Sequence, residues 1–408
     1  MNKSDRVFGV KKNIVLLGLV SMFADISSEM IYPFIPIFLA DVLKVRKALI
    51  GLIEGVAEST ASISVLFSGW FSDKIKKRKA LAVLGYSVGV VSRPLLGLAT
   101  TWSQALGLRF LDRVGKGVRA APRDAIIADS VAATERGRAF GFHRMLDTVG
   151  AIIGPLLGAG LLYYVIGRTN YRLLFMLAGI PALIAVAILA LFVAEKRAKG
   201  RDPKLPGFRL ALFPIEYKMF LVIIVLFGLG NSSNVFLILR AKSLGVSPVL
   251  VTMYYVAFSL TYAGFSYPAG ILSDAIGRRS VLIIGYLAFA LVYVGLALAA
   301  RAVYMLPLFI LYGTFPALTD GVQRAFAADM SPAHLRASGL GLYHFLNGLS
   351  LLPASIIGGW LWDAVGPKAT FLYGAATATL AVLIFVFVWP RISRSPLPDR
   401  SRGQVSRG

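Results

Sequence analysis

Charged side chains lie inside several long apolar stretches in the first half of the chain, whereas the matching stretches of the second half carry few acids. A charge at bilayer depth costs roughly 2.5 to 3.5 kcal/mol to insert, so such residues usually face a partner or a cavity and serve a function. Carboxylates beside a guanidinium can load and release protons, and this is the chemistry that we expect. The residues concerned are Asp25, Glu29, Glu54, Glu58, Asp112, Arg113 and Asp147.

Depth along a helix places several of these groups at one level. With a rise of about 1.5 Å per residue, Asp25 lies roughly 16 Å from the start of its stretch, and Asp112 and Asp147 lie roughly 15 Å into theirs. Asp25 is our first choice for the proton carrier, followed by Glu29 and Asp112. For each single acid the alternative is a permanent ion pair that only packs helices. The expected proton-coupling group is Asp25, Glu29, Glu58, Asp112, Arg113 and Asp147.

The second half offers mostly amide, aromatic and basic side chains in its apolar stretches. Such groups suit the binding of a small molecule, because ligand pockets combine apolar walls with a few polar groups. For any one of them the alternative is a polar contact between packed helices. The expected substrate-binding residues are Asn231, Asn234, Tyr255, Tyr262, Gln323, Arg324, His344 and Asn347.

Composition places these residues in a membrane. Of the 408 residues, 57% are hydrophobic and 15% charged, and the mean hydropathy is +0.72. A helix needs about 20 apolar residues to cross a bilayer, and the alternating strands of a barrel would not give unbroken apolar runs. The fold class is therefore all-α integral membrane. Twelve transmembrane helices are predicted, at residues 14–40, 49–71, 80–99, 102–128, 138–162, 171–194, 218–240, 249–272, 281–299, 303–328, 338–362 and 368–389.

An internal repeat divides the chain into two halves. The run Gly69–Lys79 returns as Gly270–Ser280, at an offset of 201 residues, and later matches follow at an offset of 200. Repeats of this kind indicate two related halves in one membrane protein. We expect two pseudo-symmetric six-helix bundles, a linker and a basic tail, with boundaries at residues 1–194, 195–217, 218–390 and 391–408.

Basic residues indicate the sidedness of the chain. The formal net charge is +23, with 43 Lys and Arg against 20 Asp and Glu. In a soluble chain this excess suggests nucleic-acid binding, but here the bases gather in the expected linker, tail and short loops on one side of the spans. The positive-inside rule then places the N- and C-termini in the cytoplasm, with the chain in the cell membrane and no nucleic-acid partner.

Enzymatic chemistry is not indicated. The chain has no cysteine and three histidines, and it carries no zinc motif, P-loop or nucleophile elbow. Metal, phosphate and acyl-transfer chemistry depend on such motifs. We therefore expect no enzyme activity, no cofactor and no metal site.

The doubled loop motif resembles the signature of the major facilitator superfamily, over essentially the whole chain. In that family the loop after helix 2 locks one face through contacts with the other half and with an acid near the end of helix 4, a position that Asp129 matches. A topology signal alone would explain the lysines of this loop but not the repeated Gly-x-x-x-Asp. The residues expected to form the conformational gate are Gly69, Asp73, Arg78, Asp129, Arg136, Asp274 and Arg279.

Two further segments resemble motifs of the twelve-helix drug and proton antiporters. Leu111–Ala121 resembles the helix 4 motif, in which the arginine at the position of Arg113 is tied to proton transfer; Lys116 and Arg119 depart from that motif and make the helix more basic. A second segment resembles the antiporter motif of helix 5, although glycines four residues apart also let any two membrane helices pack closely. Its residues are Gly150, Gly154, Pro155 and Gly158.

The residues and the resemblance together predict a secondary active transporter that works by alternating access. We expect proton-coupled export of amphipathic, drug-like molecules, that is, an antiporter of the multidrug-efflux type. The alternatives are a proton-linked uptake carrier and a lipid or organic-anion transporter, which the extra bases Lys116 and Arg119 would suit. The expected partners are a small-molecule substrate, protons and the lipid bilayer, and the expected state is a monomer.

Overall fold

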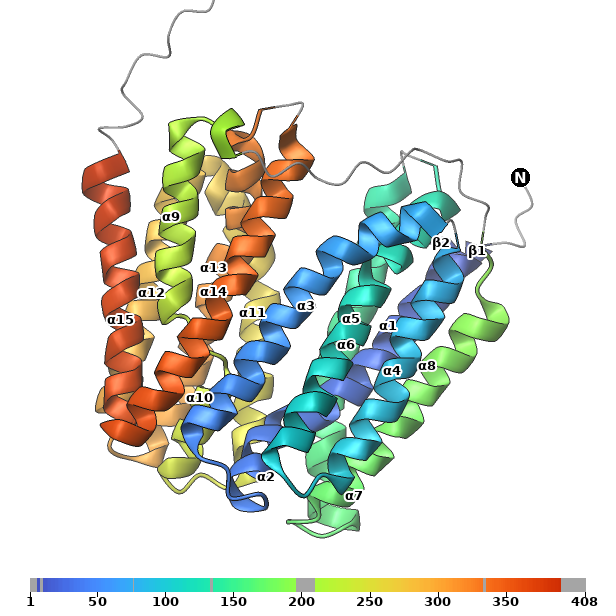
Figure 1. The fold of residues 1–408 in the computed structure, drawn as a ribbon, viewed down its shortest axis with the longest axis horizontal. Coiled ribbons are helices and arrows are strands. Elements are labelled where there is room, and N and C mark those ends of the chain that lie inside the picture. The colour runs from blue at the N-terminus through green and yellow to red at the C-terminus, as the bar shows by residue number, and fades with distance from the viewer. Residues whose placement is uncertain are drawn as a thin grey trace, which may run out of the picture.

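The computed structural model describes residues 6–7, 10–75, 77–132, 135–195, 210–332 and 335–389. The described residues form helices, apart from a short antiparallel hairpin that precedes the first of them (Figure 1). The hairpin strands are β1 Arg6–Val7 and β2 Val10–Lys11. The helices of the first half are α1 Lys12–Ile31, α2 Ile35–Asp41, α3 Lys47–Ile75, α4 Arg78–Leu98, α5 Trp102–Ser130, α6 Arg136–Gly160, α7 Tyr171–Leu177 and α8 Gly179–Phe192. Those of the second half are α9 Ile215–Gly230, α10 Val235–Ser243, α11 Pro248–Ile276, α12 Arg278–Leu298, α13 Met305–Met330, α14 Arg336–Ala364 and α15 Pro367–Leu383.

Eleven helical segments among the described residues are long and apolar enough to cross a membrane, one fewer than predicted. The predicted span that falls short is 102–128, which forms the 29-residue helix α5. Acidic and basic residues along α5 make it more polar than the other long helices. It nevertheless packs against α3 and α4 along much of its length.

The helices gather into two groups, which Figure 1 shows side by side. In the first group α1 packs against α6 and α8, and α5 packs against α3 and α4. In the second group α13 packs against α11 and α12, and α15 packs against α9 and α12. The largest contact between the groups joins α3 to α14, and a smaller one joins α6 to α11.

Two breaks in the helices lie at matching positions of the repeat. A 3-10 turn at Tyr32–Phe34 separates α1 from α2, and Pro33 within it lacks the N–H that an α-helix would use. Residues 231–234 separate α9 from α10, and an offset of 200 residues places the first break at 232–234. Because these residues leave the helical path, the side chain of Asn234 faces the space between the two groups.

The two groups meet at the end of the molecule that carries α2 and α10. There the Asp363 carboxylate accepts hydrogen bonds from the backbone N–H groups of Lys47 (3.1 Å) and Ala48 (2.8 Å), and Lys242 forms an ion pair with Asp41. A little deeper, Ser59 Oγ donates to the carbonyl oxygen of Gly348 at 2.7 Å. The groups are therefore held together at this end, which we call the α2/α10 end, and the opposite one is called the hairpin end.

Candidate binding cavity

A cavity with two lobes lies between the two groups of helices. The larger lobe has a volume of about 670 Å³ and is walled by α1, α6, α11 and α13. The smaller lobe has a volume of about 460 Å³ and is walled by α1, α3, α5, α6 and α14. Four charged residues line both lobes, namely Asp25, Glu29, Arg144 and Asp147. The charged residues at the centre of the cavity thus come from α1 and α6.

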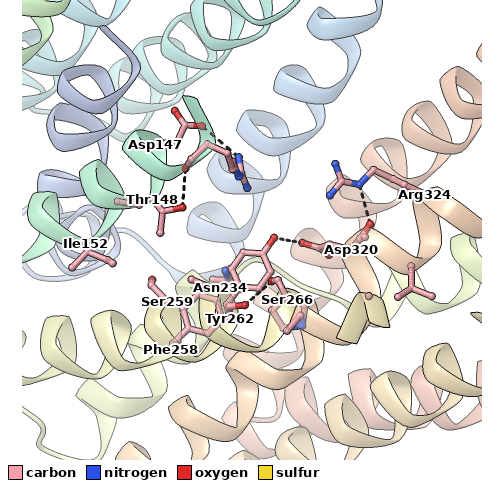
Figure 2. A pocket seen from close by; sticks show the side chains of 18 of the residues that line it. Asp147, Thr148, Ile152, Asn234, Phe258, Ser259, Tyr262, Ser266, Asp320 and Arg324 are labelled. Atoms are coloured by element: carbon pink, nitrogen blue, oxygen red, sulfur yellow. Dashed lines mark hydrogen bonds and ion pairs between the residues drawn. The ribbon is translucent and has the colours of Figure 1, made fainter. Parts of the chain in front are cut away.

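The larger lobe sets acids of the first group opposite aromatic and hydroxyl groups of the second. Figure 2 shows Asp147 and Thr148 on one side and Tyr262 on the other, where the Tyr262 hydroxyl donates a hydrogen bond of 2.9 Å to Asp320. The lobe continues along α11 to Arg278, which begins α12 at the hairpin end. The cavity therefore reaches from the middle of the molecule towards the hairpin end.

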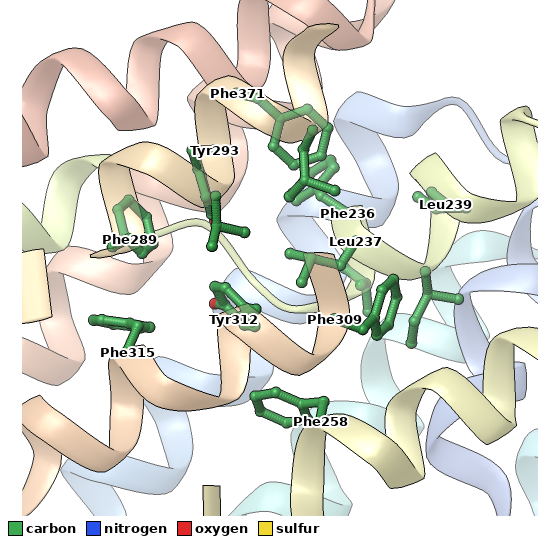
Figure 3. Packing of buried hydrophobic residues seen from close by; sticks show 14 of the residues in the cluster. Phe236, Leu237, Leu239, Phe258, Phe289, Tyr293, Phe309, Tyr312, Phe315 and Phe371 are labelled. Carbon is green, nitrogen blue, oxygen red and sulfur yellow. The ribbon is translucent and has the colours of Figure 1, made fainter. Parts of the chain in front are cut away.

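Aromatic residues form a packed core behind the larger lobe. Phe227 stacks on Tyr286 with ring centroids 4.1 Å apart, and Phe289 stacks on Tyr293 at 3.9 Å. Figure 3 shows Phe258, which also lines the lobe, among the neighbouring rings of this core. Large buried rings contribute much of the packing energy of a core, so the second group presents a firm apolar wall to the cavity.

Of the predicted proton-coupling residues, Asp25, Glu29 and Asp147 line the cavity. Asp25 lies 3.9 Å from an Arg119 Nη atom, and Asp147 lies 3.4 Å from Arg144. Two acids expected to share one level are thus brought together by α1 and α6.

The other predicted proton-coupling residues form ion pairs within the first group. Arg113 binds Glu58 at 2.9 Å. Asp112 is buried and accepts from Arg93 Nε at 3.0 Å, so its partner is a residue of α4 and not a group of the cavity. For Asp112, the geometry corresponds to the alternative of a permanent ion pair between helices.

Arg93 is a functional candidate that was not among the residues predicted from the sequence. Its Nη1 atom donates a hydrogen bond of 3.1 Å to the carbonyl oxygen of Ala24, next to Asp25 in the chain. The guanidinium therefore joins α4, α5 and α1 directly behind the cavity. The sequence did indicate this residue, because Arg93 is the one charged residue in the apolar stretch 80–99.

Five of the predicted substrate-binding residues line the cavity, with Asn234, Tyr255, Tyr262 and Arg324 in the larger lobe and His344 in the smaller. The other three are not among the residues that line either lobe; they are Asn231, Gln323 and Asn347.

Gln323 lies inside the second group of helices, where it bonds two tyrosines, and not in the cavity. It donates to the Tyr286 hydroxyl at 3.1 Å and accepts from the Tyr343 hydroxyl at 2.8 Å. These are polar contacts between packed helices, the alternative to substrate binding. Asp320, which is not among the eight predicted residues, lines the larger lobe instead.

The glycines of the antiporter-like motif bring α6 against α1. A Cβ atom added at Gly150 would lie 2.5 Å from the Met22 carbonyl oxygen, and one at Gly158 would lie 2.3 Å from the Met30 carbonyl oxygen. Between them, a Cβ at Gly154 would lie 2.9 Å from the Glu29 Cβ. This close approach sets the acids of α1 beside Asp147 of α6.

Replacement of Gly154 by Ala is expected to destabilise the protein by about 1 to 3 kcal/mol, because backbone atoms of α1 would have to move. Gly160→Ala, on the same helix, is the matched control, since nothing lies within 4 Å of its added Cβ. The measurement is thermal unfolding of both variants in detergent. Equal unfolding temperatures for the two variants would show that the approach of α1 to α6 does not require glycine.

The predicted gate is paired differently in the two halves. Arg78 forms an ion pair with Asp129, as the resemblance implies. In the second half Arg278, and not the predicted Arg279, pairs with Asp274 at 2.7 Å and with Asp329 at 3.3 Å.

The loop lengths explain this correction. One residue, Gly277, joins α11 to α12, whereas residues 76–77 join α3 to α4, so the offset between the halves changes from 201 to 200 within the loop. Arg279 instead donates to the Val386 carbonyl oxygen at 3.5 Å. The surroundings of the gate residues Gly69, Asp73 and Arg136 lie outside the described part of the chain, as do the tail 391–408 and residues 196–209 of the linker.

Comparison with known proteins agrees with this architecture. The sequence profile of the Major Facilitator Superfamily matches residues 17–225 and again residues 219–407. An uncharacterized MFS-type transporter of Methanocaldococcus jannaschii is 38% identical over 393 residues, covering 95% of this chain and 97% of that protein. Multidrug resistance protein MdtH of Salmonella arizonae is 22% identical over 347 residues, 84% of each chain. The crystal structure of the nucleoside transporter NupG has a similar fold, with a TM-score of 0.78 at 14% identity, covering 95% of this chain and 100% of that chain.

Proposed function

Because the chain belongs to the Major Facilitator Superfamily, whose members are membrane transporters and not enzymes, we propose that it exports amphipathic small molecules in exchange for protons. The observation that carries this proposal is the cavity in which Asp25, Glu29 and Asp147 face an aromatic wall. The carboxylates can bind protons, and the aromatic wall can make apolar contacts with the cargo. The distant relative named a multidrug resistance protein supports export.

We further propose that α5 is the twelfth span and that the chain forms two six-helix bundles, at residues 1–194 and 218–390. The buried charges of α5 support this reading. Arg109 is paired with Glu54, Arg113 with Glu58 and Asp112 with Arg93, so its charged face meets protein and not lipid.

The termini are proposed to lie in the cytoplasm of a monomer in the cell membrane. The turns between α3 and α4 and between α11 and α12 lie at the hairpin end and are basic, as the positive-inside rule requires of a cytoplasmic side. With this orientation the cavity opens to the cytoplasm, and contacts at the α2/α10 end close the outer side. Alternating access then requires these outer contacts to break while Arg78 and Arg278 help to close the hairpin end.

Exchange follows if protons and cargo compete for the same carboxylates. Protonation of Asp25 or Glu29 removes the negative charge that holds a cationic group, so a proton arriving from outside releases the cargo there. By linkage, cargo binding disfavours proton binding by the same factor. One protein that alternates between a cargo-bound and a proton-bound form moves the two in opposite directions.

Transport in inverted vesicles with an imposed pH gradient tests the proposal. Export by exchange predicts accumulation of an amphipathic cation when the vesicle interior is acidic, and a proton ionophore should abolish it. Accumulation driven by an alkaline interior would identify a proton-linked uptake carrier. A cargo flux that does not depend on the pH gradient would exclude proton coupling.

Alternating access makes a separate prediction, which the absence of native cysteine makes easy to measure. A cysteine in place of Ser259, which lines the larger lobe, is expected to react with a membrane-impermeant thiol reagent from the cytoplasmic side. A cysteine in place of Thr370, which is 1% exposed, is the unreactive control. Cargo that traps the outward-open form should slow the cytoplasmic reaction of the Ser259→Cys variant. Modification of this cysteine from the outer side alone would contradict the proposed orientation.

A further inference from the structure

Two cavity side chains of opposite charge have no direct partner among the described residues. Glu29 of α1 lines both lobes, and Lys116 of α5 lines the smaller lobe, where its side chain is exposed. Within the described ranges neither residue has a side-chain hydrogen bond or an ion pair. Both are therefore available to a ligand; in the larger lobe Arg324 also has no ion pair within these ranges and donates to the carbonyl oxygen of Asp320 at 3.0 Å.

The neighbouring cavity arginines are already engaged. Arg144 lies 3.4 Å from Asp147, and Arg123 lies 2.9 Å from Asp124 and donates to Ser21 at 3.1 Å. These contacts neutralise much of the charge on the walls of the smaller lobe.

Arg119 is engaged as well. Its guanidinium lies over the Tyr86 ring at 4.2 Å and 3.9 Å from Asp25. Lys116 is thus the cation of the smaller lobe that is left to bind cargo.

Glu29 and Lys116 line the same smaller lobe, and the structure shows no ion pair between them. Asp25, which lines the same lobe, lies 3.9 Å from Arg119. Arg113 is already bound to Glu58 at 2.9 Å. A pair of opposite charges held apart by a cavity leaves room for a ligand that carries the complementary pair.

We propose that the cargo is a zwitterionic amphiphile, a statement that rests on the proposed function. Its ammonium group binds Glu29, its anionic group binds Lys116, and its apolar part lies in the larger lobe against Phe258 and Tyr255. Tyr255 lines the same lobe as Glu29, so its ring is available to contact the ammonium group as well.

Charge balance favours a zwitterion over a simple ion. A cation bound to Glu29 leaves Lys116 facing a second positive charge, and an anion bound to Lys116 leaves Glu29 facing a second negative one. Like charges that face each other across a cavity repel, whereas a zwitterion pairs both residues. Exchange for protons is retained, because a proton on Glu29 removes the partner of the ammonium group.

Equilibrium binding to the full chain in lipid nanodiscs tests the proposal with three probes that share a hexyl chain. These are hexyltrimethylammonium, a hexyl sulfobetaine and hexyl sulfate, each used below its micellar concentration. Wild-type protein is expected to bind the sulfobetaine about tenfold more tightly than either ion, which is the effect of about 1.4 kcal/mol from one additional charge pair.

Variants assign the two charges separately. Lys116→Gln and Lys116→Met should each remove the preference for the sulfobetaine over the cation, and Glu29→Gln should remove its preference over the anion. Lys368→Gln, an exposed lysine at the start of α15, is the control and should bind like wild type. Equal binding of the three probes, or an unchanged ranking in both Lys116 variants, would overturn the proposal.

The outcome is distinguishable from that of the export proposal. Proton-driven flux of the cation without any preference for the sulfobetaine would keep export and exclude the zwitterion site. A preference for the sulfobetaine that depends on Lys116 and Glu29, in a protein without proton-driven flux, would keep the site and exclude proton-coupled export.

Discussion

The Asp25→Asn variant is expected to lose proton-driven transport by roughly 100-fold, the scale on which a group that handles the proton directly contributes. Asp25 lines both lobes of the cavity, and α6 packs closely enough against α1 to bring Asp147 to the same lobes. Asparagine keeps the shape of the side chain but cannot take up a proton. Downhill exchange of cargo across the membrane should therefore persist while accumulation against a gradient stops.

Flux in inverted vesicles, with and without an imposed pH gradient, measures this difference. Glu216→Gln is the matched control, because Glu216 lies in the first turn of α9 and does not line either lobe. Asp25→Glu, which keeps a titrating group, should retain part of the driven flux. Full driven flux in Asp25→Asn would assign the proton to Glu29 or Asp147 instead.

The largest effect on stability is expected from Glu54→Ala. The Glu54 carboxylate is fully buried and accepts two hydrogen bonds from Arg109, at 2.9 Å from Nε and 2.6 Å from Nη2, while the arginine is 4% exposed. Removal of Glu54 leaves the buried Arg109 with Asp112 at 3.9 Å and without its hydrogen-bonded partner, and breaking a buried pair in this way typically costs about 3 to 5 kcal/mol. We expect the variant to unfold at a much lower temperature in lipid nanodiscs or to fail to accumulate in the membrane.

The double variant Glu54→Leu with Arg109→Met separates loss of a contact from loss of a charge partner. Replacing both members of a buried pair by apolar residues of similar size is often close to neutral, so the double variant should recover most of the stability. Thermal unfolding of the single and double variants makes the comparison. A double variant as unstable as Glu54→Ala would show that packing at this site, and not charge pairing, determines stability.

Much of the architecture follows from patterns that are local in the chain. Long apolar runs correspond to helices of the structure, and the 200-residue repeat corresponds to helices such as α4 and α12, which begin at Arg78 and Arg278. The breaks after α1 and α9 were not predicted, although Pro33 lies within the first and Gly230 directly before the second. Hydropathy reports whether a segment enters the membrane, but it carries little information about a short turn within an apolar run.

Predictions about the site rested on depth along each helix, which does not show the direction in which a side chain points. Asp25 and Asp147 were predicted to lie near one level from the helical rise, and in the structure both line the two lobes. Asp112 was expected in the cavity and instead binds Arg93, and Gln323 instead joins two tyrosines. The direction in which a side chain points depends on the rotation of its helix against its neighbours, which one sequence does not reveal.

The sequence by itself determined that this is an all-α membrane protein with an internal repeat and with charge concentrated in its first half. Those properties are sums over local residues, so composition and periodicity report them. The tertiary structure alone decided which charges pair inside a bundle and which, such as Glu29 and Lys116, face the cavity. That division arises from contacts between helices distant in the chain, where glycines such as Gly154 set how closely two helices approach.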